Sequence, residues 1–129
     1  MSEAAKKKVL VVDDYHTMIR IIKKLLVEIG FDDIDVASDG EEALQMIGSE
    51  DYDLVISDWN MDKMTGLELL EAVREDPKTK SLPFIMVTAE SKPANVLAAK
   101  NAGVSNYLVK PFTPATIREK IESVLGPLD

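Results

Sequence analysis

Four short apolar runs in this sequence end abruptly in polar side chains that could do chemistry. The runs are Val9–Val12, Leu54–Ser57, Phe84–Val87 and Tyr107–Val109. The residues that end them are Asp13 with Asp14, Asp58, Thr88 and Lys110. Three carboxylates can bind a hard divalent cation. A hydroxyl and an ammonium beside them can contact the oxygens of a phosphoryl group. They can do so only if the fold brings them together.

The apolar runs are typical of buried parallel strands. Each is short and is separated from the next by a longer stretch with helical periodicity. In an open parallel sheet, ligands bind just beyond the carboxyl ends of the strands. We therefore expect the five polar side chains to converge at one edge of one sheet.

The stretches between the strands predict five helices, and a further weak strand is expected around Ile34–Ala37. The first helix should bury Met18, Ile21, Ile22, Leu25, Leu26 and Ile29 and stop at Gly30. The second helix should run from about Glu41 to Gly48, and the third should follow a capping box of Thr65 and Glu68. The fourth should run from about Ala94 to Ala102, and the last should begin with Thr113 as its N-cap and end at Gly126. This alternation predicts an α/β fold, with helices on both faces of a doubly wound, five-stranded parallel sheet.

Length and composition narrow the class of protein. A chain of 129 residues is expected to form one domain, 1–129. The absence of cysteine excludes disulfides and thiolate metal sites. A net charge of −8 argues against nucleic-acid binding, and the basic stretch Lys6–Lys8 is expected to be a solvated lead-in to the first strand. Apolar segments are too short for a signal peptide or membrane insertion, so we expect a soluble, cytoplasmic protein.

The three aspartates predict a metal site. Taken singly, each could equally cap a helix or open a turn. Side by side, Asp13, Asp14 and Asp58 would raise one another's pKa values and destabilise the fold. A divalent cation relieves this repulsion, and Mg²⁺ characteristically binds through one or two carboxylates, waters and a phosphate oxygen.

Thr88 and Lys110 extend this prediction to phosphoryl transfer. A lysine at this place could simply pair with a carboxylate, and a threonine could cap a turn. A cation, an ammonium and a hydroxyl around one carboxylate are also the groups that phosphoryl transfer requires. Carboxylates are ionised at neutral pH, so such a nucleophile needs no general base. The single histidine, His16, has no catalytic partner in the sequence and is expected at the surface.

With these residues in place, the chain resembles the receiver domain of two-component response regulators, and more narrowly the single-domain receivers of chemotaxis. The resemblance covers the chain from Val9 to about Leu125. Its most specific segments are VVDD at 11–14, ISDWNM at 56–61, MVTAE at 86–90 and VKPFT at 109–113. The resemblance implies a flavodoxin-like fold, and the strand order 2-1-3-4-5 is taken from it.

The resemblance also implies a phosphoacceptor and a metal. Asp58 would accept a phosphoryl group from a histidine kinase, with Thr88 and Lys110 contacting the phosphoryl oxygens. The implied Mg²⁺ ligands are Asp13, Asp14, Asp58 and the backbone carbonyl of Asn60.

The resemblance implies a switch as well. The Lys110–Pro111 bond is expected to be cis, and Tyr107 matches an aromatic residue that turns inward when Thr88 is drawn toward the phosphate. Asn60 and Glu90 occupy positions that set the lifetime of the phosphoryl group in the family. The expected output surface comprises the fourth helix, the last strand and the last helix.

Two residues depart from the family's pattern in the loop after the expected phosphoacceptor. The family usually has proline at the position of Asp62 and an acidic residue at the position of Thr65. Both changes bear on the metal affinity and the shape of this loop.

The expected function is a phosphorylation-driven switch rather than an enzyme. Only Gly126–Asp129 follow the last helix, so a monomer should signal by binding a partner. In the resembled chemotaxis proteins that partner is the flagellar motor switch, and a dedicated phosphatase can act on them.

Three other functions are alternatives to this switch. A phosphate sink or a phosphorelay intermediate remains open. A phosphohydrolase with an aspartyl-phosphate intermediate is disfavoured, because the Asp-x-Asp and the cap of haloacid dehalogenase-like enzymes are missing. A flavin-binding protein is disfavoured because the strand-end loops are acidic where a phosphate must lie.

Overall fold

The predicted fold is confirmed by the computed structural model, which describes residues 3–89 and 92–128. Its strands are β1 (Lys8–Val12), β2 (Asp33–Ala37), β3 (Leu54–Asp58), β4 (Phe84–Thr88) and β5 (Asn106–Val109). Its α-helices are α1 (His16–Ile29), α2 (Gly40–Ser49), α3 (Gly66–Glu75), α4 (Pro93–Asn101) and α5 (Pro114–Leu125). The strands are parallel and lie in the order β2-β1-β3-β4-β5.

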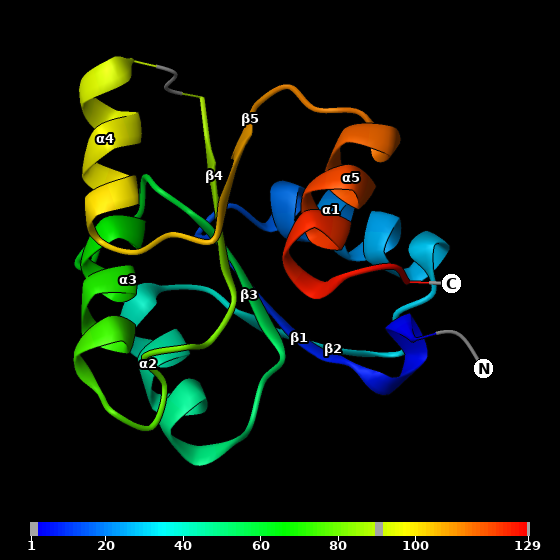
Figure 1. The fold of residues 1–129 in the computed structure, drawn as a ribbon, viewed down its shortest axis with the longest axis horizontal. Coiled ribbons are helices and arrows are strands. Elements are labelled where there is room, and N and C mark those ends of the chain that lie inside the picture. The colour runs from blue at the N-terminus through cyan, green and yellow to red at the C-terminus, as the bar shows by residue number, and fades with distance from the viewer. Residues whose placement is uncertain (1–2, 90–91, 129) are drawn as a thin grey trace.

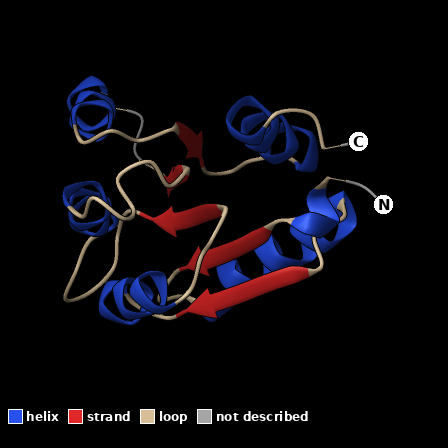
Figure 2. Cartoon of the chain, turned by 60° about the horizontal axis from the view of Figure 1, so that its bottom comes forward, coloured by secondary structure: helices blue, strands red, loops and turns tan. Residues whose placement is uncertain are grey.

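The sheet forms the middle of three layers. Helices α1 and α5 cover one face, and α2, α3 and α4 cover the other (Figure 1). The strands run in one direction across the molecule (Figure 2). Successive strand residues therefore enter two different cores: Val9 and Val11 pack beneath α1 and α5, whereas Leu10 and Val12 pack toward the opposite helices. Burial on both faces explains why the strands are continuous apolar runs.

Local capping signals set the beginnings of several helices. Thr65 accepts a hydrogen bond from the Glu68 amide, and the Glu68 side chain accepts one from the Thr65 amide, so the predicted capping box is present. Thr113 caps α5 through the amide of Thr116. Gly30 ends α1 with a φ of 123°, a conformation that glycine adopts at low cost.

One part of the prediction for α1 is wrong. Ile21 was expected in the core, yet 44% of its surface is exposed, whereas Ile19 is buried and was not predicted. The centre of the buried face lies at Ile22 and Leu26. At about 100° per residue, Ile21 lies about 100° around the helix from Ile22, but Ile19 lies only about 60° away. The predicted buried face of α1 was therefore rotated too far toward Ile21 and away from Ile19.

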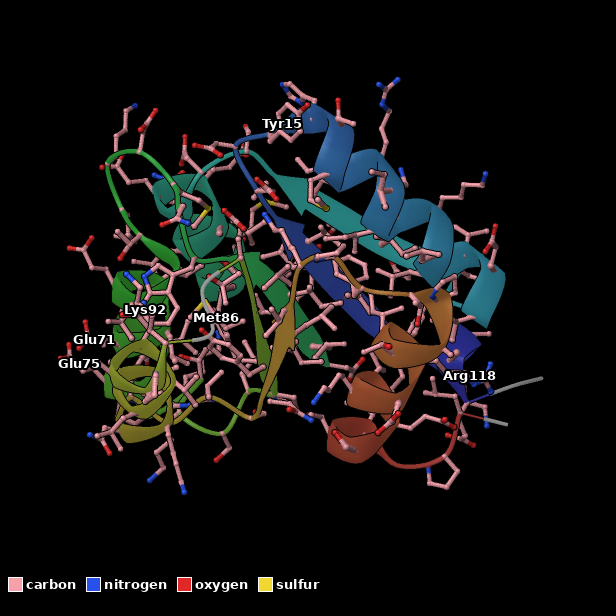
Figure 3. All side chains as sticks on the ribbon, turned by 90° about the horizontal axis from the view of Figure 1, so that it is seen from above. Tyr15, Glu71, Glu75, Met86, Lys92 and Arg118 are labelled. Atoms are coloured by element: carbon pink, nitrogen blue, oxygen red, sulfur yellow. The ribbon has the colours of Figure 1, made fainter. Side chains whose placement is uncertain are left out.

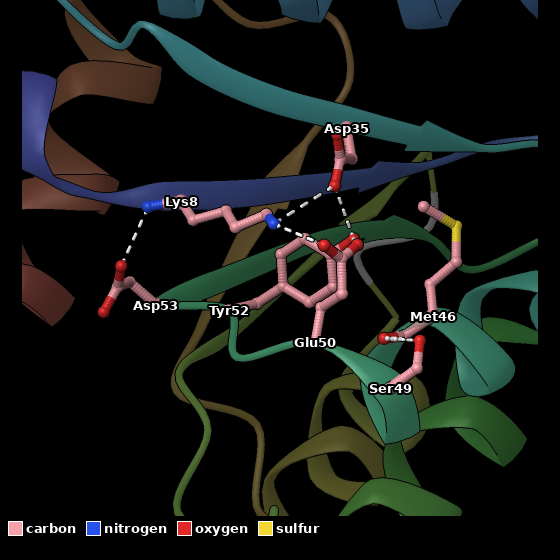
Figure 4. Close-up of polar contacts among 7 residues, drawn as sticks. All are labelled: Lys8, Asp35, Met46, Ser49, Glu50, Tyr52 and Asp53. Atoms are coloured by element: carbon pink, nitrogen blue, oxygen red, sulfur yellow. Dashed lines mark hydrogen bonds and ion pairs between the residues drawn. The ribbon is translucent and has the colours of Figure 1, made fainter.

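The lead-in to β1 also differs from the prediction. Lys8 is the first residue of β1, and its ammonium lies 2.8 Å from Glu50 and 3.9 Å from Asp35 (Figure 4). The Lys8 amide donates to Asp53 Oδ2 at 2.8 Å, and the Tyr52 hydroxyl donates to Asp35 at 2.7 Å. This network forms because Asp35 on β2 and two acidic residues before β3, Glu50 and Asp53, surround Lys8 at the start of β1.

A hollow of about 360 Å³ opens beside this network, with Tyr52, Pro83 and Leu125 in its lining. It lies where the strands begin, so it is on the opposite edge of the sheet from the predicted site. Among the described residues, no helix is long and apolar enough to cross a membrane.

Candidate functional site

The register of the sheet brings the predicted polar residues together. Val12 pairs with Ser57, so Asp13 and Asp58 lie side by side at the ends of β1 and β3. Thr88 pairs with Val109, so Lys110 follows one residue beyond. The carboxyl ends of β1, β3, β4 and β5 thus lie at one edge of the sheet, as the sequence predicted.

Three carboxylates form the acidic part of this site. One oxygen each of Asp13, Asp14 and Asp58 lies within 4.8 Å of the others, a spacing at which they could hold a metal ion. Asp13 and Asp58 are buried, with 2% and 5% of their surfaces exposed, whereas Asp14 is exposed. The sheet therefore fixes two of the carboxylates, and the third reaches in from the surface.

Asp13 is buried with one of its carboxylate oxygens unpartnered among the described residues. Its Oδ1 accepts a hydrogen bond from the Tyr15 amide at 3.0 Å, but its buried Oδ2 has no hydrogen-bond partner among the described residues. Burial, together with the nearby Asp58 charge, raises the pKa of Asp13 to about 6, although the Tyr15 amide and Lys110 oppose this shift. An orphaned carboxylate oxygen beside two other carboxylates fits a bound divalent cation.

Asp58 and Lys110 form a close ion pair. The Lys110 ammonium lies 2.7 Å from Asp58 Oδ1 as an ion pair, and that oxygen accepts no hydrogen bond from the described residues. The Lys110 amide donates to the Thr88 carbonyl at 2.8 Å, and the Lys110–Pro111 bond is cis, as the resemblance implied. The lysine thus lies where it can neutralise Asp58 or a negatively charged group bound to it.

The backbone of Trp59, directly after Asp58, is fixed by two hydrogen bonds. The Trp59 amide donates to the Val87 carbonyl, and its carbonyl accepts from the Gly66 amide, both at 2.9 Å. Gly66 has no room for a side chain, because a Cβ there would lie 2.2 Å from the Asp58 carbonyl oxygen and 2.8 Å from the sulfur of Met86. Met86, labelled in Figure 3, is fully buried.

Sequence reasoning missed Gly66. The available signal was a glycine directly after the N-cap Thr65, at a position where most residues would form the helix more favourably.

The loop between Trp59 and Gly66 contains both departures from the family's pattern. Thr65 serves as the N-cap of α3, which gives this residue a structural role. The amide of Asp62 donates to Asp14 Oδ2 at 3.4 Å, and the Met64 amide donates to the Asp62 carbonyl at 2.7 Å. Lys63, between them, has a φ of 67°, so the chain turns sharply there. Asn60 is exposed in the same loop.

The remaining predicted residues lie around the site. Tyr107 is half-buried, and its ring meets that of Trp59 edge-on, with centroids 6.4 Å apart and an interplanar angle of 75°. Thr88 is fully buried. His16 is exposed at the start of α1, as expected. Glu90, expected to influence the phosphoryl lifetime, lies outside the described residues.

Comparisons with known proteins agree with this architecture. Residues 9–122 match the response regulator receiver domain family. The chain is 50% identical over 117 residues to the chemotaxis protein CheY of Pseudomonas aeruginosa, covering 91% of this chain and 94% of the relative. It is 47% identical over 121 residues to CheY-3 of Vibrio cholerae, covering 94% and 93%. The solved structure of CheY4 of Vibrio cholerae superposes with a TM-score of 0.86 at 36% identity, covering 92% and 98%.

Proposed function

This chain belongs to the response regulator receiver domain family, and from that premise we propose that it is a phosphorylation-driven switch whose phosphoacceptor is Asp58. The observation that carries the proposal is the 2.7 Å pair of Asp58 with Lys110, next to the orphaned oxygen of Asp13. A carboxylate held between a cation and an unfilled acidic cluster is suited to accept a phosphoryl group.

In the proposed reaction, an Asp58 oxygen attacks the phosphorus of a phosphohistidine in line. The new O–P bond forms as the P–N bond breaks, and the electron pair of that bond returns to the imidazole of the kinase. Lys110 neutralises charge on the phosphoryl oxygens, and the Thr88 hydroxyl donates a hydrogen bond to one of them. The hydrogen bond from the Lys110 amide to the Thr88 carbonyl keeps the ammonium and the hydroxyl on neighbouring strand ends.

The proposed cofactor is Mg²⁺, held by Asp13, Asp14, Asp58 and the backbone carbonyl of Asn60. The spacing of the three carboxylates and the unpartnered Asp13 oxygen support this assignment. When bound, the ion supplies positive charge beside the transferring oxygens. The carboxylates hold it in place.

The proposed output is a change of partner affinity. Thr88, Tyr107 and Pro111 link the site to a surface formed by α4, β5 and α5. This surface carries three exposed apolar side chains, Val96, Leu97 and Val109. Its proposed partner is a flagellar motor switch protein, because close relatives are named as chemotaxis proteins.

Further details of the proposal follow the family. The protein would act as a monomer in the cytoplasm. Asn60 and Glu90 would set the phosphoryl lifetime, and a dedicated phosphatase could shorten it. A motor-switch peptide that binds more tightly in the presence of a phosphate mimic supports the motor output. Equal binding with and without the mimic indicates a phosphate sink or relay intermediate instead.

The phosphoacceptor is tested by incubating the protein with a small phosphodonor and Mg²⁺ and weighing it intact. We expect the parent to gain one phosphoryl group, labile to acid and base, and Asp58→Asn to gain none. Undiminished modification of Asp58→Asn would overturn the assignment. Omitting Mg²⁺ should greatly slow the gain in the parent.

A further inference from the structure

Each of the three acidic side chains at the site makes a polar contact with another described residue. Asp13 accepts from the Tyr15 amide, and Asp58 pairs with Lys110. Asp14 is exposed, and its contact is the backbone amide of Asp62, 3.4 Å from Asp14 Oδ2. An exposed aspartate loses side-chain freedom when it binds a metal, so a contact that orients it beforehand lowers the free-energy cost of binding.

The Asp62 amide is presented by a loop that is fixed on both sides. Trp59 is bonded to Val87 on β4 and to Gly66 at the start of α3. Between these anchors, the Met64 amide closes a tight turn on the Asp62 carbonyl at 2.7 Å. The direction of the Asp62 N–H therefore follows from the backbone of the loop and does not depend on the exposed side chain of Asp62.

We propose that the backbone N–H of Asp62, and not its carboxylate, positions Asp14 for the metal. This inference rests on the proposed Mg²⁺ site. An N–H aimed at a carboxylate is a charge-assisted donor, and it also offsets part of the repulsion among the three aspartates. Groups that orient metal ligands in this way commonly affect metal affinity. Asp62 is thus a positioning residue.

The inference gives a physical meaning to the departure at position 62. Proline, which the resembled family usually carries there, has no N–H and cannot make this bond. A receiver with proline at this position must orient its second aspartate by other means. The donor in this chain is available because residue 62 is not proline.

Two substitutions separate the backbone from the side chain. Asp62→Ala removes the carboxylate and keeps the N–H, and Asp62→Pro removes both. Mg²⁺ is titrated into each by Trp59 fluorescence and by calorimetry. Because the contact is long and exposed, we expect Asp62→Pro to bind Mg²⁺ about threefold to tenfold more weakly than Asp62→Ala. Thermal melts in EDTA verify that both variants fold without metal.

A double-mutant cycle with Asp14→Ala, which removes the acceptor oxygen, tests whether the amide acts through Asp14. In that background, the difference between Asp62→Pro and Asp62→Ala should fall to about twofold or less. If the difference persists there, the proline acts by distorting the loop, and the inference is overturned. It is equally overturned if the proline and alanine variants bind alike with Asp14 intact. The titration of the parent protein tests the proposed metal site separately. If the parent binds no Mg²⁺, the metal site itself is refuted.

Discussion

The backbone of Gly66 lies directly against Asp58, so that a Cβ on Gly66 would lie 2.2 Å from the Asp58 carbonyl oxygen. The first residue of α3 and the last residue of β3 thus touch through main-chain atoms. The Gly66 amide also donates to the Trp59 carbonyl. The start of α3 therefore fixes where the loop of residues 59–65 lies relative to the end of β3. This close approach of the two backbones requires glycine at position 66.

Gly66→Ala should destabilise the protein, because the helix start and the strand end must move apart to admit the methyl group. We expect a loss of about 1–3 kcal/mol in the free energy of unfolding, the range typical of overpacking. Gly48→Ala is the matched control, since nothing lies within 4 Å of its added Cβ and α2 continues through it. That change should stabilise by about 0.5–1 kcal/mol. Urea unfolding of both variants measures the difference, and equal stabilities would contradict the contact.

The raised pKa of Asp13 predicts an unusual pH dependence without metal. Its pKa is about 6 in the folded protein against 3.8 for a free side chain, so between these values the folded state holds more protons. The Asp13 contribution to stability should then fall as pH rises from about 4 to about 6, by roughly 3 kcal/mol. Asp13→Asn has no such group and should be the more stable protein at pH 7 in EDTA. Melts that rank the two proteins equally at pH 7 would argue against the buried charge.

The same group should make metal binding depend on pH. A proton on Asp13 competes with the cation, so Mg²⁺ affinity should fall by up to about tenfold per unit as pH drops below about 6. Above that pH the affinity should level off. Titrations from pH 5 to 8, followed by Trp59 fluorescence, measure this dependence. A flat profile would show that Asp13 is not a ligand.

Much of this architecture was predictable from local sequence. Strands buried on both faces are uninterrupted apolar runs, and the capping residues Thr65 and Thr113 mark helix starts by their own hydrogen bonds. Because parallel strands share one carboxyl edge, Asp58 and Lys110 could be expected to meet there. The strand order itself came from the resemblance.

Contacts set by the tertiary structure were not predictable. The crowding at Gly66 arises between β3 and α3, and the network of Lys8 joins residues far apart in the chain. The exposed position of Ile21 depends on how α1 is rotated on the sheet. Local periodicity fixes such a rotation only approximately, since several apolar residues compete for the buried stripe.

Thr88→Ala should separate phosphorylation from signalling. Asp58 and Lys110 remain in place, so the variant should still gain a phosphoryl group. It lacks the hydroxyl that phosphorylation would draw inward, and partner binding should respond weakly. Affinity for a motor-switch peptide, with and without beryllofluoride as phosphate mimic, measures the coupling. A variant that switches as fully as the parent would refute the role of Thr88.

The ring contact between Trp59 and Tyr107 makes it possible to observe the switch in two steps. The backbone of Trp59 is bonded on both sides, so its ring has a fixed base beside Asp58. Mg²⁺ binding should alter its fluorescence through the nearby charge. Any later movement of Tyr107 should alter it again, because the edge-on contact at 6.4 Å is lost or changed.

Tyr107→Leu should therefore keep the fluorescence response to Mg²⁺ and lose most of the further response to beryllofluoride. Tyr107→Phe keeps the ring and should keep both responses, so it serves as the control for packing. The proposed mechanism requires that the second response depend on Thr88 as well, because Thr88 would make room for the tyrosine when drawn toward the phosphate. Stepwise addition of Mg²⁺ and then beryllofluoride to the three proteins and to Thr88→Ala tests the order of events. If Tyr107→Leu gives the same second response as the parent, the signal arises at the phosphorylation site alone and Tyr107 does not take part in the switch.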